Sequence, residues 1–282
     1  MELADALSLS KNLLTQAGIP SPEADSYWLL AHTLSIPKSE LLTLLTLGYQ
    51  LTEEQARSFR QNLDQRVKRI PLQHITGSAG FRRIELHVGP GVFIPRYETE
   101  QVVQIAIDIL SELPGIPKVA DVGTGSGAIA ISIAKETDAE VYAIEVDAAA
   151  VKFAKLNIRS LQASVDLRIG RFEEELPKLR DLDLIVSNPP YIPIDAVPLD
   201  PEVRDFDPEL ALYSGADGLE AIRELISLAP LSLKSGGWLV LEHSDGQSDL
   251  VRELLLSAGY EEIRAHPDPA GRLRAVSAHW RN

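Results

Sequence analysis

The first 70 residues carry apolar side chains at helical spacing. Apolar positions recur every three or four residues over 3–17, and Gly18 followed by Pro20 ends this element. Ser21 and Pro22 have the order of an N-cap and a first-turn proline, so they predict the start of a second helix. The residues expected to face inward on this second helix are Ala24, Tyr27, Trp28, Ala31 and Leu34.

A third helix is predicted to begin near residue 52. Thr52 and Gln55 have the spacing of a capping box, and the helical pattern ends before Pro71. The spacing of apolar residues then changes over Gly80–Val88, where they are separated by polar or turn residues. The sequence therefore predicts a small helical bundle followed by a short strand or hairpin.

Beyond residue 118, short apolar runs alternate with helical patterns. Such an alternation is typical of a parallel sheet covered by helices on both faces. The apolar runs are Lys118–Val122, Glu140–Ile144, Val165–Ile169, Leu182–Ser187 and Trp238–Glu242. The helical patterns are Ala128–Thr137, Ala148–Leu161, Leu219–Ala229 and Gln247–Ala258. Two final runs, Glu262–Ala265 and Leu273–His279, are separated by a link containing Gly271, and we expect them to form an antiparallel edge.

Composition narrows the class of protein. There are 27 Lys and Arg against 41 Asp and Glu, a formal net charge of −14, so no stable complex with nucleic acid is expected. Cysteine is absent, which excludes disulfides and thiolate chemistry. The Met1–Asp5 start is acidic where a signal peptide is basic, and no apolar run approaches the ~20 residues that span a bilayer. These features predict a soluble cytoplasmic protein without a membrane partner.

A glycine-rich loop lies where the first parallel strand is followed by a helix. Ligands of open α/β sheets bind beyond the carboxyl ends of the strands, and glycines allow the backbone to approach them closely. The next strand ends at Glu145, 22 residues after Gly123, where a carboxylate would accept hydrogen bonds from a ribose diol. The loop also fits the dinucleotide pattern, so an NAD-dependent oxidoreductase remains open at this point. The loop residues are Gly123, Thr124, Gly125, Ser126 and Gly127.

A second turn, Asn188-Pro189-Pro190-Tyr191, follows the fourth strand at the same edge of the sheet. Two consecutive prolines fix φ and have no N–H, so the turn offers mainly carbonyl oxygens. The two hydrogens of an NH₂ group would be accepted by the Asn188 side-chain oxygen and the Pro189 carbonyl. The Tyr191 ring would stack against the planar group that carries this nitrogen. The turn therefore predicts a site for a planar amide or amino nitrogen.

A conjugated nitrogen is a poor nucleophile because its lone pair is delocalised. Hydrogen bonds to both of its hydrogens favour pyramidal character and hold it in line with a methyl–sulfur bond, so placement carries most of the rate. A sulfonium donor loses its charge during transfer, and no strong base is needed to begin. Because a hydride-transferring enzyme has no evident use for such a turn, the two motifs together predict a methyltransferase that uses S-adenosylmethionine.

At these residues the chain resembles the bacterial release factor glutamine methyltransferases, historically called the HemK family, over nearly its full length. The segments that carry the resemblance are Pro71–Gly77, Phe93–Glu100, Asp121–Ala128, Asn188–Tyr191, Glu202–Pro208 and Leu241–His243. The family implies an α/β fold with a seven-stranded Rossmann-like methyltransferase sheet. It also implies a helical substrate-recognition domain over 1–75, a β-hairpin linker over 76–92 and a methyltransferase domain over 93–282.

The resemblance further implies methylation of the glutamine amide in the Gly-Gly-Gln motif of class I peptide chain release factors, a step connected with translation termination. S-adenosylmethionine would be the methyl donor. By similarity, its binding residues would be Gly123, Thr124, Gly125, Ser126, Gly127, Glu145, Phe172 against the adenine, and Asn188 near the methyl group. The catalytic glutamine pocket would be formed by Asn188, Pro189, Pro190 and Tyr191, beside a cleft lined by Phe93, Ile94, Arg96, Glu98 and Thr99.

Three residues depart from the family pattern. Tyr97 stands where proline is frequent, and Glu145 replaces the more usual aspartate. Arg171 occupies a position where an acidic residue is common, and an arginine cannot accept a hydrogen bond from the adenine amino group.

The active-site turn leaves the substrate open. It suits the glutamine of a ribosomal protein equally well, and only the N-terminal region and the overall resemblance favour release factors. An adenine amino group of DNA would also fit, but it requires a flipped base and a phosphate-binding surface, which the acidic composition disfavours. A non-catalytic adenosine-binding module would not require the intact turn. The six histidines show no metal-like spacing, so no metal is expected, and the oligomeric state is undetermined, with a monomer as the expectation.

Overall fold

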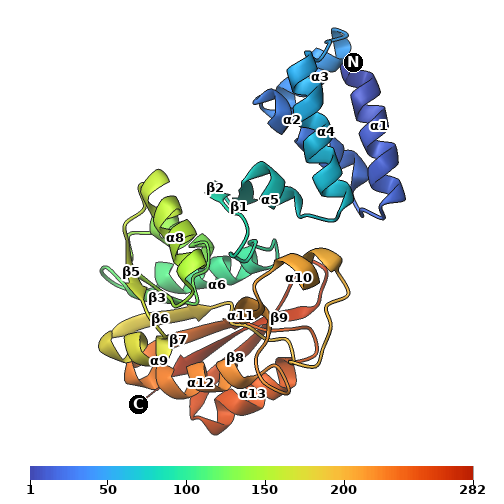
Figure 1. Cartoon of the computed structure of the whole chain (residues 1–282). Coiled ribbons are helices and arrows are strands. Elements are labelled where there is room, and N and C mark those ends of the chain that lie inside the picture. The colour runs from blue at the N-terminus through green and yellow to red at the C-terminus, as the bar shows by residue number, and fades with distance from the viewer. Residues whose placement is uncertain (282) are drawn as a thin grey trace. The chain divides into compact units, whose positions relative to one another are not determined.

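The computed structural model describes residues 1–281. The chain divides into two compact units (Figure 1). The first unit, here called the helical unit, comprises Met1–Ser78 and Pro198–Phe206, and the second, the sheet unit, begins at Ala79 and contains the remaining described residues. Among these residues, no helix has the length and apolar character needed to cross a membrane.

The helical unit is a bundle with its own apolar core. Its helices are α1 (Leu3–Gln16), α2 (Pro22–Leu34), α3 (Lys38–Thr46), α4 (Glu53–Val67) and α5 (Leu72–Thr76). The predicted capping box is confirmed, because Gln55 N donates to Thr52 Oγ1 at 3.2 Å and Thr52 N donates to Gln55 Oε1 at 2.9 Å. The large fully buried side chains of the core include Leu3, Leu14, Leu29, Leu30, Leu41, Phe59 and Leu63.

The inward face predicted for α2 is partly wrong. Ala31 is buried, but Ala24 is exposed and Trp28 is 48% exposed. The α2 face that turns inward carries Asp25 instead, because its carboxylate pairs with Arg66 of α4, with Nε and Oδ2 2.7 Å apart. A buried ion pair of this kind cannot be read from apolar periodicity.

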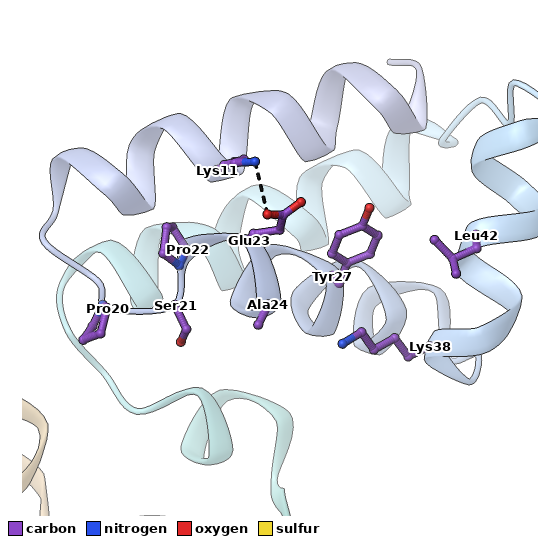
Figure 2. Close-up of a pocket in the computed structure, with 9 residues that line it drawn as sticks. All are labelled: Lys11, Pro20, Ser21, Pro22, Glu23, Ala24, Tyr27, Lys38 and Leu42. Atoms are coloured by element: carbon purple, nitrogen blue, oxygen red, sulfur yellow. Dashed lines mark ion pairs between the residues drawn. The ribbon is translucent and has the colours of Figure 1, made fainter.

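The exposed side of α2 borders an open groove of the helical unit (Figure 2). Lys11 of α1 and Glu23 of α2 form an ion pair across it, with Nζ and Oε2 3.3 Å apart. The groove is lined by Lys11, Pro20, Ser21, Pro22, Glu23, Ala24, Tyr27, Lys38 and Leu42. Its lining charges are both basic and acidic, so the groove has no single-sign character.

The segment Pro198–Phe206 belongs to the helical unit although its neighbours in sequence belong to the sheet unit. It contains α10 (Pro201–Phe206), whose Glu202 accepts a hydrogen bond from Arg66 NH1 at 2.8 Å and another from Arg69. Arg66 therefore binds two carboxylates, those of Asp25 and Glu202, while it is only 5% exposed. A buried charge needs such compensation, so the ion pair between Arg66 and Glu202 holds α10 on the bundle.

A hairpin is formed by β1 (Ser78–Phe81) and β2 (Ile84–His87), so it begins two residues before the Gly80–Val88 stretch that was predicted to form a strand or hairpin. Its apolar side chains Phe81 and Leu86 are buried in the same core as helix α6 (Thr99–Ser111).

A seven-stranded sheet forms the centre of this unit, as predicted. Its strands are β3 (Lys118–Val122), β4 (Glu140–Glu145), β5 (Val165–Ile169), β6 (Leu182–Ser187), β7 (Leu233–Glu242), β8 (Tyr260–Pro267) and β9 (Leu273–Trp280). The spatial order is β5-β4-β3-β6-β7-β9-β8. Strands β3 to β7 pair in parallel, while β9 pairs antiparallel with β7 and β8, so the predicted antiparallel edge is confirmed.

Helices cover both faces of the sheet, and the two faces have separate apolar clusters (Figure 1). Alternating residues of one strand enter opposite clusters: Leu184 and Val186 of β6 face one cluster, and Ile185 faces the other. On the first face lie α6, α7 (Ala128–Glu136) and α8 (Ala148–Ser160). On the second lie α9 (Phe172–Glu175), η1 (Leu176–Lys178), α12 (Glu220–Leu228), η2 (Ala229–Leu231) and α13 (Ser248–Ser257). A short helix α11 (Glu209–Leu212) precedes α12 in the chain.

Candidate active site

The two motifs singled out in the sequence meet at the carboxyl edge of the sheet. Strands β3 and β6 are neighbours, and their last residues, Val122 and Ser187, are partners in the parallel register. The buried Ser187 hydroxyl donates to the Val122 carbonyl at 2.7 Å. Gly123 follows the first of these residues and Asn188 follows the second, so the glycine loop and the Asn-Pro-Pro-Tyr turn start side by side.

The glycine loop has a backbone conformation that favours glycine at three positions. Gly123, Gly125 and Gly127 have φ values of 71°, 59° and 88°, in the left-handed region that favours glycine. A Cβ at Gly127 would lie 2.8 Å from Ile131 Cδ1, so this glycine permits the first turn of α7 to pack. A Cβ at Gly123 or Gly125 would meet no atom within 4 Å. The loop therefore leaves open space next to the backbone where a ligand can approach.

Asp121 supports this loop from within the sheet. Its Oδ2 accepts hydrogen bonds from Thr124 Oγ1 at 2.5 Å and from Ala130 N at 3.1 Å. Burial raises the pKa of the Asp121 carboxyl to about 7, against the lowering effect of these two hydrogen bonds. Asp121 thus fixes the loop to the start of α7.

The loop is also anchored from outside by Asn157 of α8. The buried Asn157 Nδ2 donates to the Ser126 carbonyl at 2.9 Å and to the His87 carbonyl at 3.0 Å. Its Oδ1 accepts from His87 N at 2.7 Å, so one amide joins the hairpin to the glycine loop. The sequence analysis missed this residue, because an asparagine in a helix carries no local sign of such a role.

Glu145 ends β4 beside the glycine loop. Its Oε2 accepts from Gly125 N at 2.8 Å, and its Oε1 accepts from Val146 N and Asp147 N, both at 2.8 Å. The carboxylate is 7% exposed and has a fixed orientation. A carboxylate has about four acceptor positions, so three backbone bonds leave one on Oε2 for a hydroxyl group.

Phe172 lies past the end of the neighbouring strand β5, where Gly170 N donates to the Glu145 carbonyl at 2.9 Å. Phe172 is partly buried and packs on the cluster of the second sheet face. Arg171, one of the three residues that depart from the family pattern, is exposed and forms an ion pair with Glu173. The Arg171 guanidinium is therefore bound to Glu173 on the short helix α9.

The side chain of Asn188 has a defined orientation. Its Nδ2 donates to Thr99 Oγ1 at 3.1 Å. Within residues 1–281, no hydrogen bond of the structure occupies its Oδ1 or the carbonyl of Pro189. The turn thus has two oxygens without a hydrogen bond in this part of the chain, and both are of a kind that can accept from an NH₂ group.

Tyr191 is held at both ends. Its hydroxyl donates to Glu242 Oε1 at 3.4 Å, and its carbonyl accepts from Gln247 Nε2 at 3.1 Å. Gly218, with a φ of 76°, packs against this carbonyl so closely that a Cβ would lie 2.3 Å from the Tyr191 oxygen. Burial raises the pKa of the Tyr191 hydroxyl, which keeps it protonated as a donor. The sequence analysis named neither Gly218 nor Gln247, because both are distant from the turn in sequence.

The segment from Phe93 to Thr99 contributes a second group of polar side chains. Arg96 forms an ion pair with Asp207, and its guanidinium carbon lies 4.9 Å from the centroid of the Phe93 ring. Glu98 pairs with Arg272, with its Oε1 3.5 Å from NH2. Of this predicted group, Thr99 is the member that hydrogen-bonds Asn188 within the described part of the chain.

A buried carboxylate completes the arrangement. Glu242 ends β7 and is 1% exposed. Burial raises its pKa to about 7, while the nearby Thr99 and Tyr191 hydroxyls and the charge of Arg274 lower it. The neighbouring His243 is buried as well, and burial lowers its pKa, so its ring is neutral at pH 7.

Comparison with known proteins identifies the class of protein to which this chain belongs. Residues 5–77 match the family model described as the PrmC N-terminal domain, and residues 83–197 match the methyltransferase small domain. Among solved structures, the T. thermophilus 16S rRNA N2 G1207 methyltransferase in complex with AdoMet and guanosine is similar, with a TM-score of 0.52 and 22% identity. The match covers 72% of this chain and 50% of that one. The protein is therefore a methyltransferase with a Rossmann-like sheet.

The sequence relatives define the family more closely. The chain is 42% identical over 270 residues to the release factor glutamine methyltransferase of Streptomyces coelicolor, covering 94% of this chain and 93% of the relative. It is 37% identical over 292 residues to the enzyme of the same name from Bifidobacterium longum, covering 99% of each. The chain belongs to the release factor glutamine methyltransferase family, as the sequence analysis inferred.

Proposed function

We propose that this enzyme transfers a methyl group from S-adenosylmethionine to the side-chain amide nitrogen of the glutamine in the Gly-Gly-Gln motif of class I peptide chain release factors. The names of its relatives support this substrate. One feature of the site carries the chemical part of the proposal: Asn188 donates through Nδ2 to Thr99, and its Oδ1 is left to accept from a substrate.

A primary carboxamide fits the two free oxygens of the turn. Its NH₂ group has two hydrogens, which Asn188 Oδ1 and the Pro189 carbonyl would accept together. Both acceptors are held by rigid neighbours, since Pro189 and Pro190 have restricted φ and the Asn188 amide is bound to Thr99. The nitrogen is thereby oriented before reaction, which is the source of most of the expected rate gain. Its surplus proton leaves after the new bond has formed.

The residues beside the turn fit the methyl donor. The open space next to Gly123 and Gly125 admits a ligand close to the backbone, and Glu145 keeps one acceptor position for a ribose hydroxyl. Phe172 would pack against the adenine, with Thr124, Ser126 and Gly127 completing the binding loop. When bound, S-adenosylmethionine supplies an electron-poor methyl carbon attached to a positively charged sulfur.

The remaining assignments concern the larger substrate. We infer that residues 1–75 recognise the release factor, that 76–92 form the linker, and that the methyltransferase domain runs from 93 to 282. Asn282 lies outside the described residues. Phe93, Arg96, Glu98 and Thr99 would line the entrance for the glutamine, with Tyr191 stacked against its carboxamide. The enzyme would act in the cytoplasm as a monomer.

The substrate assignment is tested with tritium-labelled S-adenosylmethionine. The purified enzyme is incubated in parallel with a class I release factor, the same factor with its glutamine replaced by alanine, ribosomal proteins, and DNA. The proposal predicts label in the intact release factor and background label in the alanine variant. Equal labelling of the two release factors, or preferential labelling of a ribosomal protein or of DNA, would overturn the assignment.

A further inference from the structure

The fully buried amide of Asn157 on α8 binds the backbone of two other segments. Its Nδ2 donates to the carbonyls of Ser126 and His87 at 2.9 and 3.0 Å, and its Oδ1 accepts from His87 N at 2.7 Å. A backbone carbonyl only accepts and a backbone N–H only donates, so these partners fix the orientation of the amide. The two partners lie 31 and 70 residues earlier in the chain.

The bond to Ser126 acts on the peptide group that closes the glycine loop. The N–H of the same peptide group belongs to Gly127, and it donates to the Thr124 carbonyl at 2.8 Å. Earlier in the loop, Gly125 N donates to Glu145 Oε2 at 2.8 Å. The loop is therefore held from two sides, by a carboxylate of β4 and by an amide of α8.

The loop contains Gly123, Gly125 and Gly127, and three glycines make its conformation easy to lose. Glycine has more conformational freedom in a disordered segment than any other residue, so ordering such a loop is costly. If the loop became ordered only when a ligand bound, this cost would weaken the binding of the ligand. A loop that is already held in its binding conformation avoids this loss of affinity.

The backbone that follows β2 packs along one face of α8. Ala149, Phe153 and Asn157 are four residues apart and therefore share this face. A Cβ at Gly91 would lie 2.9 Å from Ala149 Cβ, and a Cβ at Gly89 would lie 3.0 Å from Phe153 Cζ, so the backbone approaches the helix closely. Asn157 consequently connects the glycine loop to a segment that is packed along α8.

We propose that Asn157 is a positioning residue for the methyl donor: by holding the Ser126–Gly127 peptide group against α8, it keeps the glycine loop in its binding conformation before S-adenosylmethionine arrives. This inference rests on the proposed binding of S-adenosylmethionine to the loop. It does not depend on which nitrogen receives the methyl group. Asn157 acts through the backbone of the loop, because its Nδ2 and Oδ1 are both bound to backbone groups.

The first test uses the full-length wild-type enzyme without a ligand. Hydrogen exchange of the Gly127 N–H, followed by NMR, reports whether its bond to the Thr124 carbonyl exists before the donor binds. We expect exchange at least about a hundredfold slower than in an unstructured peptide. Exchange at the unprotected rate, with protection appearing only after S-adenosylhomocysteine is added, would overturn the proposal.

The second test removes the amide. Asn157→Leu has nearly the same size and cannot hydrogen-bond, whereas Asn157→Asp can donate at most one hydrogen where Nδ2 donates two. Affinity falls in proportion to the fraction of molecules with a competent loop, so the dissociation constant of S-adenosylhomocysteine should rise at least about tenfold in Asn157→Leu. It should rise by a smaller factor, about threefold or more, in Asn157→Asp. With saturating donor, kcat should stay within about threefold of the wild type.

The matched control is Tyr260→Phe, which also removes a buried hydrogen bond to a backbone carbonyl. The Tyr260 hydroxyl donates to the Ile226 carbonyl at 3.1 Å, on the second face of the sheet. Lost stability alone lowers the fraction of folded molecules, and with it the binding stoichiometry and the apparent kcat. It leaves the dissociation constant of the folded molecules unchanged, so Tyr260→Phe should bind S-adenosylhomocysteine with the wild-type constant. Titration calorimetry measures both quantities.

The outcomes separate this inference from the proposed function. A normal dissociation constant in the Asn157 variants, with or without a loss of stoichiometry, overturns the positioning role alone, and so does an equal rise in Tyr260→Phe. A wild-type enzyme that binds no S-adenosylhomocysteine overturns the proposed donor site and this inference together. A wild-type enzyme that binds the donor product but methylates no glutamine amide overturns only the substrate assignment.

Discussion

Ser187 Oγ donates to the carbonyl of Val122 at 2.7 Å and so joins the residue before the Asn-Pro-Pro-Tyr turn to the residue before the glycine loop. Both residues end strands that are adjacent and parallel. The distance between the two motifs is therefore set by the sheet itself, which is rigid and buried. In the proposed function, this arrangement would place the methyl donor and the amide nitrogen next to each other without a dedicated linker between their sites.

The close contact of Gly218 with Tyr191 predicts a specific loss on substitution. In Gly218→Ala the new Cβ would lie 2.3 Å from the Tyr191 carbonyl oxygen, so the turn must move. We expect kcat to fall at least about tenfold, because small displacements of a positioned group are costly. Steady-state methylation of the release factor measures this effect.

The variant Gly246→Ala is a matched control that separates the effect of backbone strain from the effect of the contact with Tyr191. Gly246 also has a positive φ, 89°, but a Cβ there would meet no atom within 4 Å. Gly246→Ala should therefore cost roughly 1 kcal/mol of stability and leave kcat near the wild-type value. Equal kcat in the two variants would show that the Tyr191 contact does not matter for catalysis.

Glu145 is expected to contribute to cofactor affinity. Glu145→Gln replaces one acceptor oxygen by a donor NH₂ group, which disturbs the bonds with Gly125 N, Val146 N and Asp147 N and removes the position left for a ribose hydroxyl. Binding of S-adenosylhomocysteine, measured by titration calorimetry, should weaken about tenfold or more. Glu140→Gln, at the opposite end of the same strand, is the control and should bind normally. An unchanged dissociation constant for Glu145→Gln would remove this residue from the binding site.

The raised pKa of Glu242 predicts how stability depends on pH. Burial raises this pKa from 4.5 to about 7, so the folded protein binds more protons than the unfolded chain between these values. The contribution of Glu242 to stability is most favourable below about pH 4.5 and is lost as the pH rises through about 7. Relative to Glu242→Gln, the wild type should thus lose on the order of 3 kcal/mol over this range. Urea denaturation of both proteins at several pH values measures the difference, and parallel curves would contradict the assignment.

The ion pairs of Arg66 should stabilise the helical unit. Arg66→Ala leaves the carboxylates of Asp25 and Glu202 without their shared partner, in a buried environment. Breaking such a buried pair costs about 3–5 kcal/mol. Hydrogen exchange of the α2 and α4 amides in the full-length protein should accelerate accordingly. Lys11→Ala removes the exposed partner of Glu23 (Figure 2). It should change the free energy of opening of the same amides by less than about 1 kcal/mol.

Much of the sheet was predictable from sequence because its strands are short, apolar and separated by helical patterns. The bounds of Lys118–Val122, Val165–Ile169 and Leu182–Ser187 agree with the structure. The meeting of the two motifs was predictable as well, since the carboxyl ends of parallel strands lie at one edge. By contrast, helix α3 was missed, because its apolar residues follow closely on those of α2.

The parts that could not be predicted depend on contacts between distant residues. Nothing local distinguishes Glu242, Gln247 or Gly218 from other residues after a strand or before a helix, yet all three hold Tyr191. In the same way, the sequence of Pro198–Phe206 does not show that this segment belongs to the helical unit. Its assignment depends on Arg66 and Arg69, more than a hundred residues earlier in the chain.

In the proposed function Asn188 acts on the incoming amide nitrogen, and the decisive variant is Asn188→Ala. Turnover with the release factor and the dissociation constant of S-adenosylhomocysteine are measured on the same preparation. We expect kcat to fall by at least about a hundredfold while the dissociation constant changes by less than about threefold, because the lost bond acts mainly in the transition state. A variant that keeps near-normal kcat, or that loses cofactor affinity in proportion to kcat, would contradict it.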